Sequence, residues 1–337
     1  MQALWMILGA FFFATMAVGI KVASGSFSTF ELVFYRGVVS VIFMSMVLHT
    51  RKIPIRTPVP LMHVWRSLIG VLSLVAWFYA IAHLPLATAM TLNYMSGVWV
   101  AAFLVGSTVW AGSLKNAKQQ IPVAMTVLVG FAGVVMILRP TIEQNQIFAG
   151  LVGVSSGMIA AMAYLQVAAL GRKGEPVERT VFYFSLGATV TGALSMLVTD
   201  TSEWVWPQAW LLLPIGILAA MGQWCMTRAY NDGATMVVAN LQYSGIVFSA
   251  FFGLFLFGDQ IPFMGWAGIF VIVLSAIAST ALRARSDGQG AGAAGCSPPR
   301  RRRRRSAASH RHARQLHAAQ ERDGQPRGLK VRVKVPR

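Results

Sequence analysis

Charged side chains are scarce in this sequence of 337 residues. Asp, Glu, Lys and Arg together make up 12% of the chain, whereas soluble domains carry about 25%. The hydrophobic fraction is 55% and the mean hydropathy is +0.58, which is more apolar surface than a water-soluble core can bury. These values exclude a soluble enzyme or binding domain and indicate a membrane protein.

Cysteine is nearly absent, since the chain has only Cys225 and Cys296. Cys225 lies inside an apolar run and Cys296 lies in the C-terminal tail, so neither a disulfide framework nor a metal-ligand spacing is present. We expect no cofactor and no bound metal.

Positive charge is plentiful, but much of it is confined to one end of the chain. Of the 29 Lys and Arg residues, 16 lie in residues 283–337, against three acidic residues. A Gly/Ala linker, two prolines and a run of arginines open this tail, which cannot bury a core. We expect a basic, disordered tail. Binding to anionic lipid headgroups is the alternative, and nucleic acid is not an expected partner.

Ten long apolar segments precede the tail. A helix needs about 20 mostly apolar residues to cross the membrane. Segments of that kind lie near residues 3–22, 30–48, 66–84, 86–110, 121–138, 148–170, 180–199, 210–230, 234–257 and 261–282. Their apolar runs are continuous, whereas the strands of a membrane barrel alternate. The sequence therefore predicts an all-α integral membrane protein with ten transmembrane helices.

Basic residues in the short connections predict the orientation of the chain. Lys and Arg gather after the second, fourth and sixth segments and are rare in the other connections, and cytoplasmic loops carry such an excess. These cations are Arg51, Lys52, Arg56, Arg66, Lys115, Lys118, Arg172, Lys173 and Arg179. We expect a multi-pass protein of the inner (cytoplasmic) membrane with both termini in the cytoplasm.

The ten segments divide into two similar sets of five. Residues 80–100 align without gaps on residues 229–249, so that a Leu-Asn-Tyr motif at 92–94 matches a Leu-Gln-Tyr motif at 241–243. Because five is odd, the second set enters the membrane from the opposite face, which gives an inverted repeat. The predicted units are the first repeat at 1–140, the second repeat at 141–282 and the tail at 283–337.

This layout and three short motifs resemble the EamA-like members of the drug/metabolite transporter superfamily, over about residues 3–282. The motifs are Phe34-Tyr35-Arg36, the stretch from Arg66 to Tyr79 followed by Leu84-Pro85-Leu86-Ala87, and Phe257-Gly258-Asp259. The resemblance implies a secondary carrier whose cavity is lined by the third, fourth, eighth and ninth helices, with contributions from the first and sixth. It also implies a substrate among amino acids, nucleosides, vitamins and related metabolites. The chain departs from the family pattern at Ala111-Gly112-Ser113, where the first repeat lacks the acid that Asp259 supplies in the second.

Polar and aromatic side chains inside the apolar segments are the candidate substrate-binding residues, because polar groups at membrane depth are costly. They are Trp77, Tyr79, Asn93, Tyr94, Trp99, Tyr164, Gln166, Gln223, Trp224, Asn240, Gln242 and Tyr243. Amides can donate to and accept from a polar substrate, and aromatic rings can stack on a planar group or a cation. Hydrogen bonding between helices and anchoring at the membrane interface are the alternative roles.

Three charged residues around the start of the second segment are candidates for coupling or ion pairing: Lys21, Glu31 and Arg36. A structural ion cluster is one interpretation. Proton coupling through Glu31 is the other, and it predicts that transport slows when a pH gradient is collapsed.

These observations favour a secondary transporter that moves a small polar metabolite by alternating access. The substrate is expected in the amino acid, nucleoside, vitamin or S-adenosylmethionine class. The alternative is a polytopic membrane enzyme acting on a lipid-like substrate, which needs clustered His, Asp or Glu that the sequence does not show, so an enzyme is not expected. The expected partners are a small-molecule substrate and the lipid bilayer, and a homodimer is left open.

Overall fold

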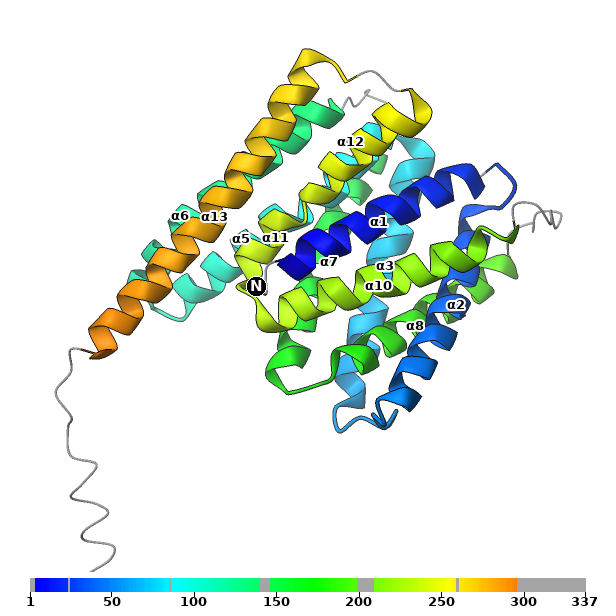
Figure 1. The fold of residues 1–337 in the computed structure, drawn as a ribbon, viewed down its shortest axis with the longest axis horizontal. Coiled ribbons are helices and arrows are strands. Elements are labelled where there is room, and N and C mark those ends of the chain that lie inside the picture. Colours follow the sequence, from blue (N-terminus) through cyan, green and yellow to red (C-terminus); the bar gives the residue numbers. More distant parts are fainter. Residues whose placement is uncertain are drawn as a thin grey trace, which may run out of the picture. The chain divides into compact units, whose positions relative to one another are not determined.

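The computed structural model describes residues 4–23, 25–84, 86–139, 146–198, 209–258 and 261–295, which form α-helices joined by short connections (Figure 1). The helices are α1 (Leu4–Ala23), α2 (Thr29–Thr50), α3 (Pro60–His83), α4 (Leu86–Tyr94), α5 (Ser96–Trp110), α6 (Leu114–Leu138), α7 (Ile147–Arg172), α8 (Val177–Met196), α10 (Leu212–Asp232), α11 (Thr235–Leu241), α12 (Ser244–Phe257) and α13 (Phe263–Gly295). No β-strand occurs within these ranges. The chain divides into two units, Met1–Ala284 and Arg285–Arg337.

Each of the ten predicted apolar segments contains helix, but two of them are broken. The segment at 86–110 is divided at Met95 into α4 and α5, and the segment at 234–257 is divided at Gln242 and Tyr243 into α11 and α12. At the second break, the amide of Tyr243 donates to the carbonyl three residues earlier at 3.1 Å, which is the spacing of a tighter 3₁₀ turn. The two breaks fall at neighbouring positions of the aligned segments.

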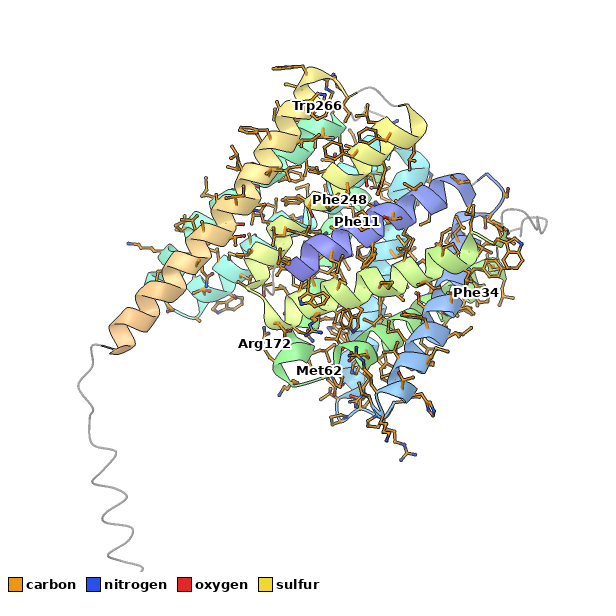
Figure 2. The ribbon with its side chains drawn as sticks, in the orientation of Figure 1. Phe11, Phe34, Met62, Arg172, Phe248 and Trp266 are labelled. Atoms are coloured by element: carbon orange, nitrogen blue, oxygen red, sulfur yellow. The ribbon has the colours of Figure 1, made fainter. Side chains whose placement is uncertain are left out.

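The outer surface of the helices is apolar. Seven stretches within the described helices are long and apolar enough to cross a membrane, and α1 adds a shorter apolar stretch. Large apolar side chains stand exposed, among them Trp110 at 94% and Phe263 at 88%, and Figure 2 shows Trp266 on the outside of α13. Soluble monomers rarely expose apolar surface on this scale. The chain is therefore a multi-pass membrane protein.

Local sequence explains where several helices begin and end. The backbone N–H of Ser28 donates to the Glu31 carboxylate at 2.6 Å, and the N–H of Glu31 donates to the Ser28 hydroxyl at 3.4 Å, so a capping box starts α2. Pro60 opens α3, where its missing N–H has no partner to lose. α12 ends at Gly258, whose φ of 70° lies in the left-handed region that favours glycine.

The early start of α3 corrects one prediction. The charge pattern placed Arg66 in the connection after the second segment, but α3 begins at Pro60 and Arg66 lies inside the helix. The polar residues around 60–66 lower the local hydropathy, and the proline that starts the helix was not counted as its first residue. Arg66 is therefore not a loop cation.

Helices far apart in the sequence pack side by side. α1 packs against α10 and α12, α2 against α8, and α3 against α7 (Figure 1). Phe11 and Phe248 meet where α1 contacts α12, with ring centroids 5.5 Å apart and the rings nearly perpendicular (Figure 2). Gly133 of α6 lies against Gly268 of α13 so closely that a Cβ at Gly133 would come within 2.8 Å of the Gly268 carbonyl oxygen. Contacts of this kind close the helices around a central cavity.

Candidate functional site

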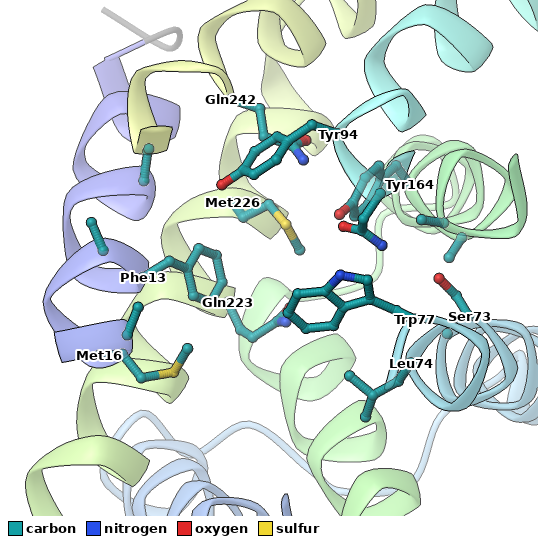
Figure 3. Close-up of a pocket in the computed structure, with 18 of the residues that line it drawn as sticks. Phe13, Met16, Ser73, Leu74, Trp77, Tyr94, Tyr164, Gln223, Met226 and Gln242 are labelled. Atoms are coloured by element: carbon teal, nitrogen blue, oxygen red, sulfur yellow. The ribbon is translucent and has the colours of Figure 1, made fainter. Parts of the chain in front are cut away.

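The central cavity has a volume of about 250 Å³ (Figure 3). Its walls come mainly from α1, α3, α4, α7 and α10, and from the junction of α11 and α12. These are the helices that the family resemblance implies, and α2 and α8 add one residue each. The polar lining includes Arg36, Arg66, Ser73, Asn93, Gln223 and Gln242, with no acidic side chain among the described residues that line it.

Helix α3 presents a continuous stripe to the cavity. Arg66, Gly70, Ser73 and Trp77 line it, and their spacing of three and four residues places them on one helix face. The hydroxyl of Ser73 donates to the carbonyl of Ser156 at 2.9 Å, which holds α3 against α7. In Figure 3 the Trp77 indole reaches into the middle of the cavity. The stripe thus combines a cation, a glycine, a hydroxyl and a large aromatic ring.

Two amides that align between the repeats also line the cavity. Asn93 lies near the end of α4 and Gln242 lies at the break between α11 and α12. The Tyr230 hydroxyl donates to the Gln242 side-chain oxygen at 3.4 Å, and the Tyr230 ring stacks on Tyr164 with centroids 5.3 Å apart. The Gln242 side chain also hydrogen-bonds the Tyr164 side chain, and Figure 3 places it beside Tyr94.

The structure brings half of the twelve candidate substrate-binding residues together. Those that line the cavity are Trp77, Asn93, Tyr94, Tyr164, Gln223 and Gln242. Those that do not line it are Tyr79, Trp99, Gln166, Trp224, Asn240 and Tyr243.

Two residues of the second group hold helices together instead. The side-chain nitrogen of Asn240 donates to the Ser275 carbonyl at 2.9 Å and to the Ser279 hydroxyl at 3.1 Å, which ties α11 to α13. The indole N–H of Trp224 donates to Glu178 at 3.1 Å, which ties α10 to α8. These contacts are the hydrogen bonding between helices that was the alternative role for such side chains.

The aromatic members of that group pack against neighbouring rings or backbone. Tyr79 stacks on His83 with ring centroids 4.1 Å apart, and Trp99 stacks on Phe103 at 6.0 Å. Tyr243 is fully buried behind Tyr94. Gln166 has its side-chain oxygen buried without a hydrogen-bond partner among the described residues.

The three coupling candidates occupy different surroundings. Glu31 is buried in the capping box of α2, and Arg36 lines the cavity. Lys21 belongs to α1, but its side chain lies outside the described part of the structure. Asp259, the acid of the second-repeat motif, and Pro85 also lie outside the described residues. Proton coupling through Glu31 stays a prediction.

A polar cluster joins the α2–α3 connection to the α7–α8 connection, and we call it the Glu175 latch: Thr57, His63, Glu175 and Arg179. Glu175 accepts hydrogen bonds from Thr57 at 2.9 Å and from Arg179 at 3.0 Å, and His63 Nε2 lies 3.2 Å from its carboxylate. Arg179 also donates to the Pro54 carbonyl at 3.0 Å. His63, Glu175 and Arg179 are all buried. No sequence signal identified this cluster, because its members are far apart in the chain.

The surroundings of Glu175 keep its carboxyl ionised. Burial acts to raise its pKa, but the hydrogen bonds from Thr57, His63 and Arg179, together with the charge of Arg179, outweigh burial and hold the pKa below its ordinary value of 4.5. His63 lies one helical turn before Arg66 on α3, so the latch lies near the Arg66 end of the cavity.

The helices and the cavity define a polytopic membrane protein with an internal cavity of mixed polarity, and comparison with known proteins places it further. Residues 1–139 match the model of the EamA-like transporter family. The pseudopaline exporter of Pseudomonas aeruginosa strain UCBPP-PA14 is 33% identical over 81% of this chain and 93% of its own length. The riboflavin transporter of Vibrio cholerae serotype O1 is 25% identical over 81% of this chain and 90% of its own length. The chain belongs to the EamA-like transporter family, within the drug/metabolite transporter superfamily.

The fold has a counterpart among solved structures. One crystal structure superposes with a TM-score of 0.71 at 17% identity, covering 83% of this chain and 98% of the other. At that identity the likeness concerns the fold alone. The family and the named relatives are small-molecule transporters, which points to transport rather than to an enzymatic reaction. Within the described residues, no group of three or more His, Cys, Asp or Glu side chains could hold a metal ion.

Proposed function

We infer that this chain is a secondary carrier that moves a small polar metabolite across the cytoplasmic membrane by alternating access. The observation that carries the proposal is the cavity in which Asn93 and Gln242, the aligned amides of the two halves, both take part. Each amide lies beside a broken helix, and carriers built from repeats place their substrate sites at such breaks near the midplane. The two named relatives, one moving pseudopaline and one riboflavin, fit a metabolite of modest size.

The pairing of helices supports two inverted repeats, 1–140 and 141–282, with ten membrane spans. On this reading α4 with α5 and α11 with α12 each make one span. α1 packs on α10, and α7 packs on α3. In both pairs the first helix of one repeat contacts the third helix of the other repeat. α2 packs on α8, its own counterpart. A two-fold axis in the membrane plane produces this exchange of partners.

Glycines on both helices allow α2 and α8 to approach closely. A Cβ at Gly37 would meet the Thr189 hydroxyl at 2.5 Å, and a Cβ at Gly192 would meet the backbone of Phe34 at 2.8 Å. The contact between these two counterpart helices therefore depends on a small residue from each repeat.

The basic residues support the proposed orientation after correction for the observed helix bounds. Several predicted loop cations lie inside helices: Arg66 in α3, Lys115 and Lys118 in α6, and Arg179 in α8. The exposed cations that remain in connections include Arg51, Lys52 and Arg56 after α2 and Lys173 after α7. These connections lie on one side of the molecule, since the latch joins them. The excess of Lys and Arg favours the cytoplasm for that side and for both termini.

Removing either aligned amide is expected to impair transport. Asn93→Ala and Gln242→Ala should each lower the initial rate about tenfold, because a hydrogen bond to the substrate contributes about 1–1.5 kcal/mol. The measurement is counterflow in proteoliposomes, in both directions, against amino acids, nucleosides, vitamins and S-adenosylmethionine.

The matched control is Gln120→Ala, since the Gln120 amide bonds to Thr108 and does not line the cavity. It should transport as the wild type does. Wild-type rates in both Asn93→Ala and Gln242→Ala would show that these amides do not belong to the site. If no member of the panel were transported, the proposed carrier function would be contradicted.

A further inference from the structure

The cavity holds positive charge that nothing in the described chain neutralises. Arg36 and Arg66 both line it, and no acidic side chain of the described residues does. The salt bridges of the described residues involve Arg51, His63, Arg179 and Arg228, and neither cavity arginine takes part in one. A buried charge is normally paired, so these arginines call for a negative group from outside the chain.

Arg66 is placed as the principal contact for such a group. The residue is only 4% exposed, and its Nε and Nη1 have no hydrogen-bond partner among the described residues. The guanidinium carbon lies 4.3 Å from the centroid of the Phe184 ring. Stacking on a ring occupies the flat face of the guanidinium, which leaves its N–H groups in the plane to donate. Those N–H groups form the fork that binds a carboxylate at two points.

Gly70 makes room for this arrangement. A Cβ at Gly70 would collide with Arg66 Nη1 and would lie 2.8 Å from the Phe184 ring. The guanidinium therefore lies over the glycine one turn further along α3, and it is held between α3 and α8. The packing of α3 against α8 therefore fixes the position of the Arg66 charge.

We propose that the transported substrate carries a carboxylate. Arg66 binds this carboxylate, and Arg36 provides a second positive charge. The organic body of the substrate lies against the aromatic and methionine walls of the cavity. This inference rests on the proposed carrier function. The rest of the lining suits such a body, because Phe13, Trp77, Tyr94 and Met226 offer apolar surface and Asn93 and Gln242 offer amides. The cavity of about 250 Å³ holds one small organic acid.

The test compares acids with amides of the same shape. The probes are N-acetyl-L-phenylalanine, N-acetyl-L-methionine and N-acetyl-L-glutamine, each with its primary amide, and phenyl phosphate as the phosphate arm. Dissociation constants are measured by isothermal titration calorimetry on the purified full chain in detergent. At least one acid should bind the wild type, with its amide at least about tenfold weaker, since a hydrogen bond to a charged group contributes enough for about a 10- to 100-fold change.

Variants assign the selectivity to Arg66. Arg66→Gln should weaken binding of the acid about 10- to 100-fold and leave the amide unchanged, and Arg66→Lys should give an intermediate loss because the fork is absent. Gly70→Ala should also weaken the acid, since it displaces the guanidinium while keeping the charge. The control Arg228→Gln removes a half-exposed arginine outside the cavity and should bind as the wild type does.

The outcomes separate this inference from the carrier function. Any of four results would overturn the carboxylate proposal. These are amides that bind as tightly as their acids, a preference for phenyl phosphate over the acids, no binding of any acid, and acid binding by Arg66→Gln that is as tight as in the wild type. If Arg66→Gln fails to fold, Gly70→Ala and the acid-to-amide ratio of the wild type carry the test. If the wild type and Arg66→Gln both carry out counterflow of neutral amides, the carrier function stands and the carboxylate site at Arg66 is rejected. If neither these probes nor the metabolite panel show counterflow, both the carrier function and the carboxylate site are rejected.

Discussion

Glu175→Gln is expected to lower the free energy of unfolding by about 3–5 kcal/mol, because it removes one partner of a buried ion pair and leaves the charge of Arg179 without compensation. The glutamine amide has nearly the same shape, so the loss reports the charge and the hydrogen bonds from Thr57, His63 and Arg179. The measurement is the apparent Tm of the purified protein in detergent.

The control for this variant is Asp232→Asn. Asp232 pairs with Arg228 at 3.8 Å, and both side chains are well exposed, at 46% and 39%. Exposed pairs contribute about 0–1 kcal/mol, so the control should hardly move the apparent Tm. Equal shifts in the two variants would show that the Glu175 latch contributes no more than a surface ion pair.

Acid should reproduce the effect of the Glu175 variant in the wild type. The pKa of Glu175 lies below its ordinary value of 4.5 in the folded chain, so its contribution to stability is fully present above the unfolded pKa and is lost as the pH falls through the folded pKa. Between neutral pH and about pH 5 the contribution should be constant. Below pH 4.5 the gap in apparent Tm between wild type and Glu175→Gln should narrow, and a constant gap down to acid pH would contradict the assignment.

Gly133→Ala should cost about 1–3 kcal/mol, which is typical of overpacking. Its Cβ would come 2.8 Å from the Gly268 carbonyl oxygen and 3.2 Å from the Ile272 nitrogen. Both are backbone atoms, so α6 and α13 have to separate to admit it. The measurement is the apparent Tm together with the yield of monodisperse protein.

Gly106→Ala is the matched control for Gly133→Ala. Gly106 lies in α5 with open space around the position of a Cβ, so alanine should be neutral or slightly stabilising there. A tolerated alanine at Gly133 would mean that α6 and α13 do not approach as closely as the structure has them.

Much of the fold follows from hydropathy alone, and the parts that do not follow have a physical reason. Each apolar segment contains helix, because length and apolar composition decide membrane helices. The breaks at Met95 and at Gln242 leave the composition unchanged, so hydropathy cannot detect them. The start of α3 was misplaced because the residues around His63 and Arg66 are polar, although both side chains are buried in the structure.

The candidate site could be predicted only in part, because residue type does not specify which way a side chain faces. Gln223 lines the cavity and its neighbour Trp224 faces α8. Gln242 lines the cavity and Asn240 faces α13. Residues one or two apart on a helix do not share a face, and a broken segment hides its register. Arg66 was missed because it was counted among the loop cations.

The central claim is that the cavity opens to each side of the membrane in turn, and thiol accessibility tests it most directly. A single cysteine at Gln223 is introduced with Cys225→Ala and Cys296→Ser, and a membrane-impermeant thiol reagent is added separately to each side of oriented vesicles. We expect labelling from both sides. Glu175→Gln weakens the contacts that join the α2–α3 and α7–α8 connections. When this substitution is added, labelling should therefore become faster from the side of the Glu175 latch and slower from the other side. Labelling from one side only, or an increase in both rates as in an open pore, would contradict alternating access.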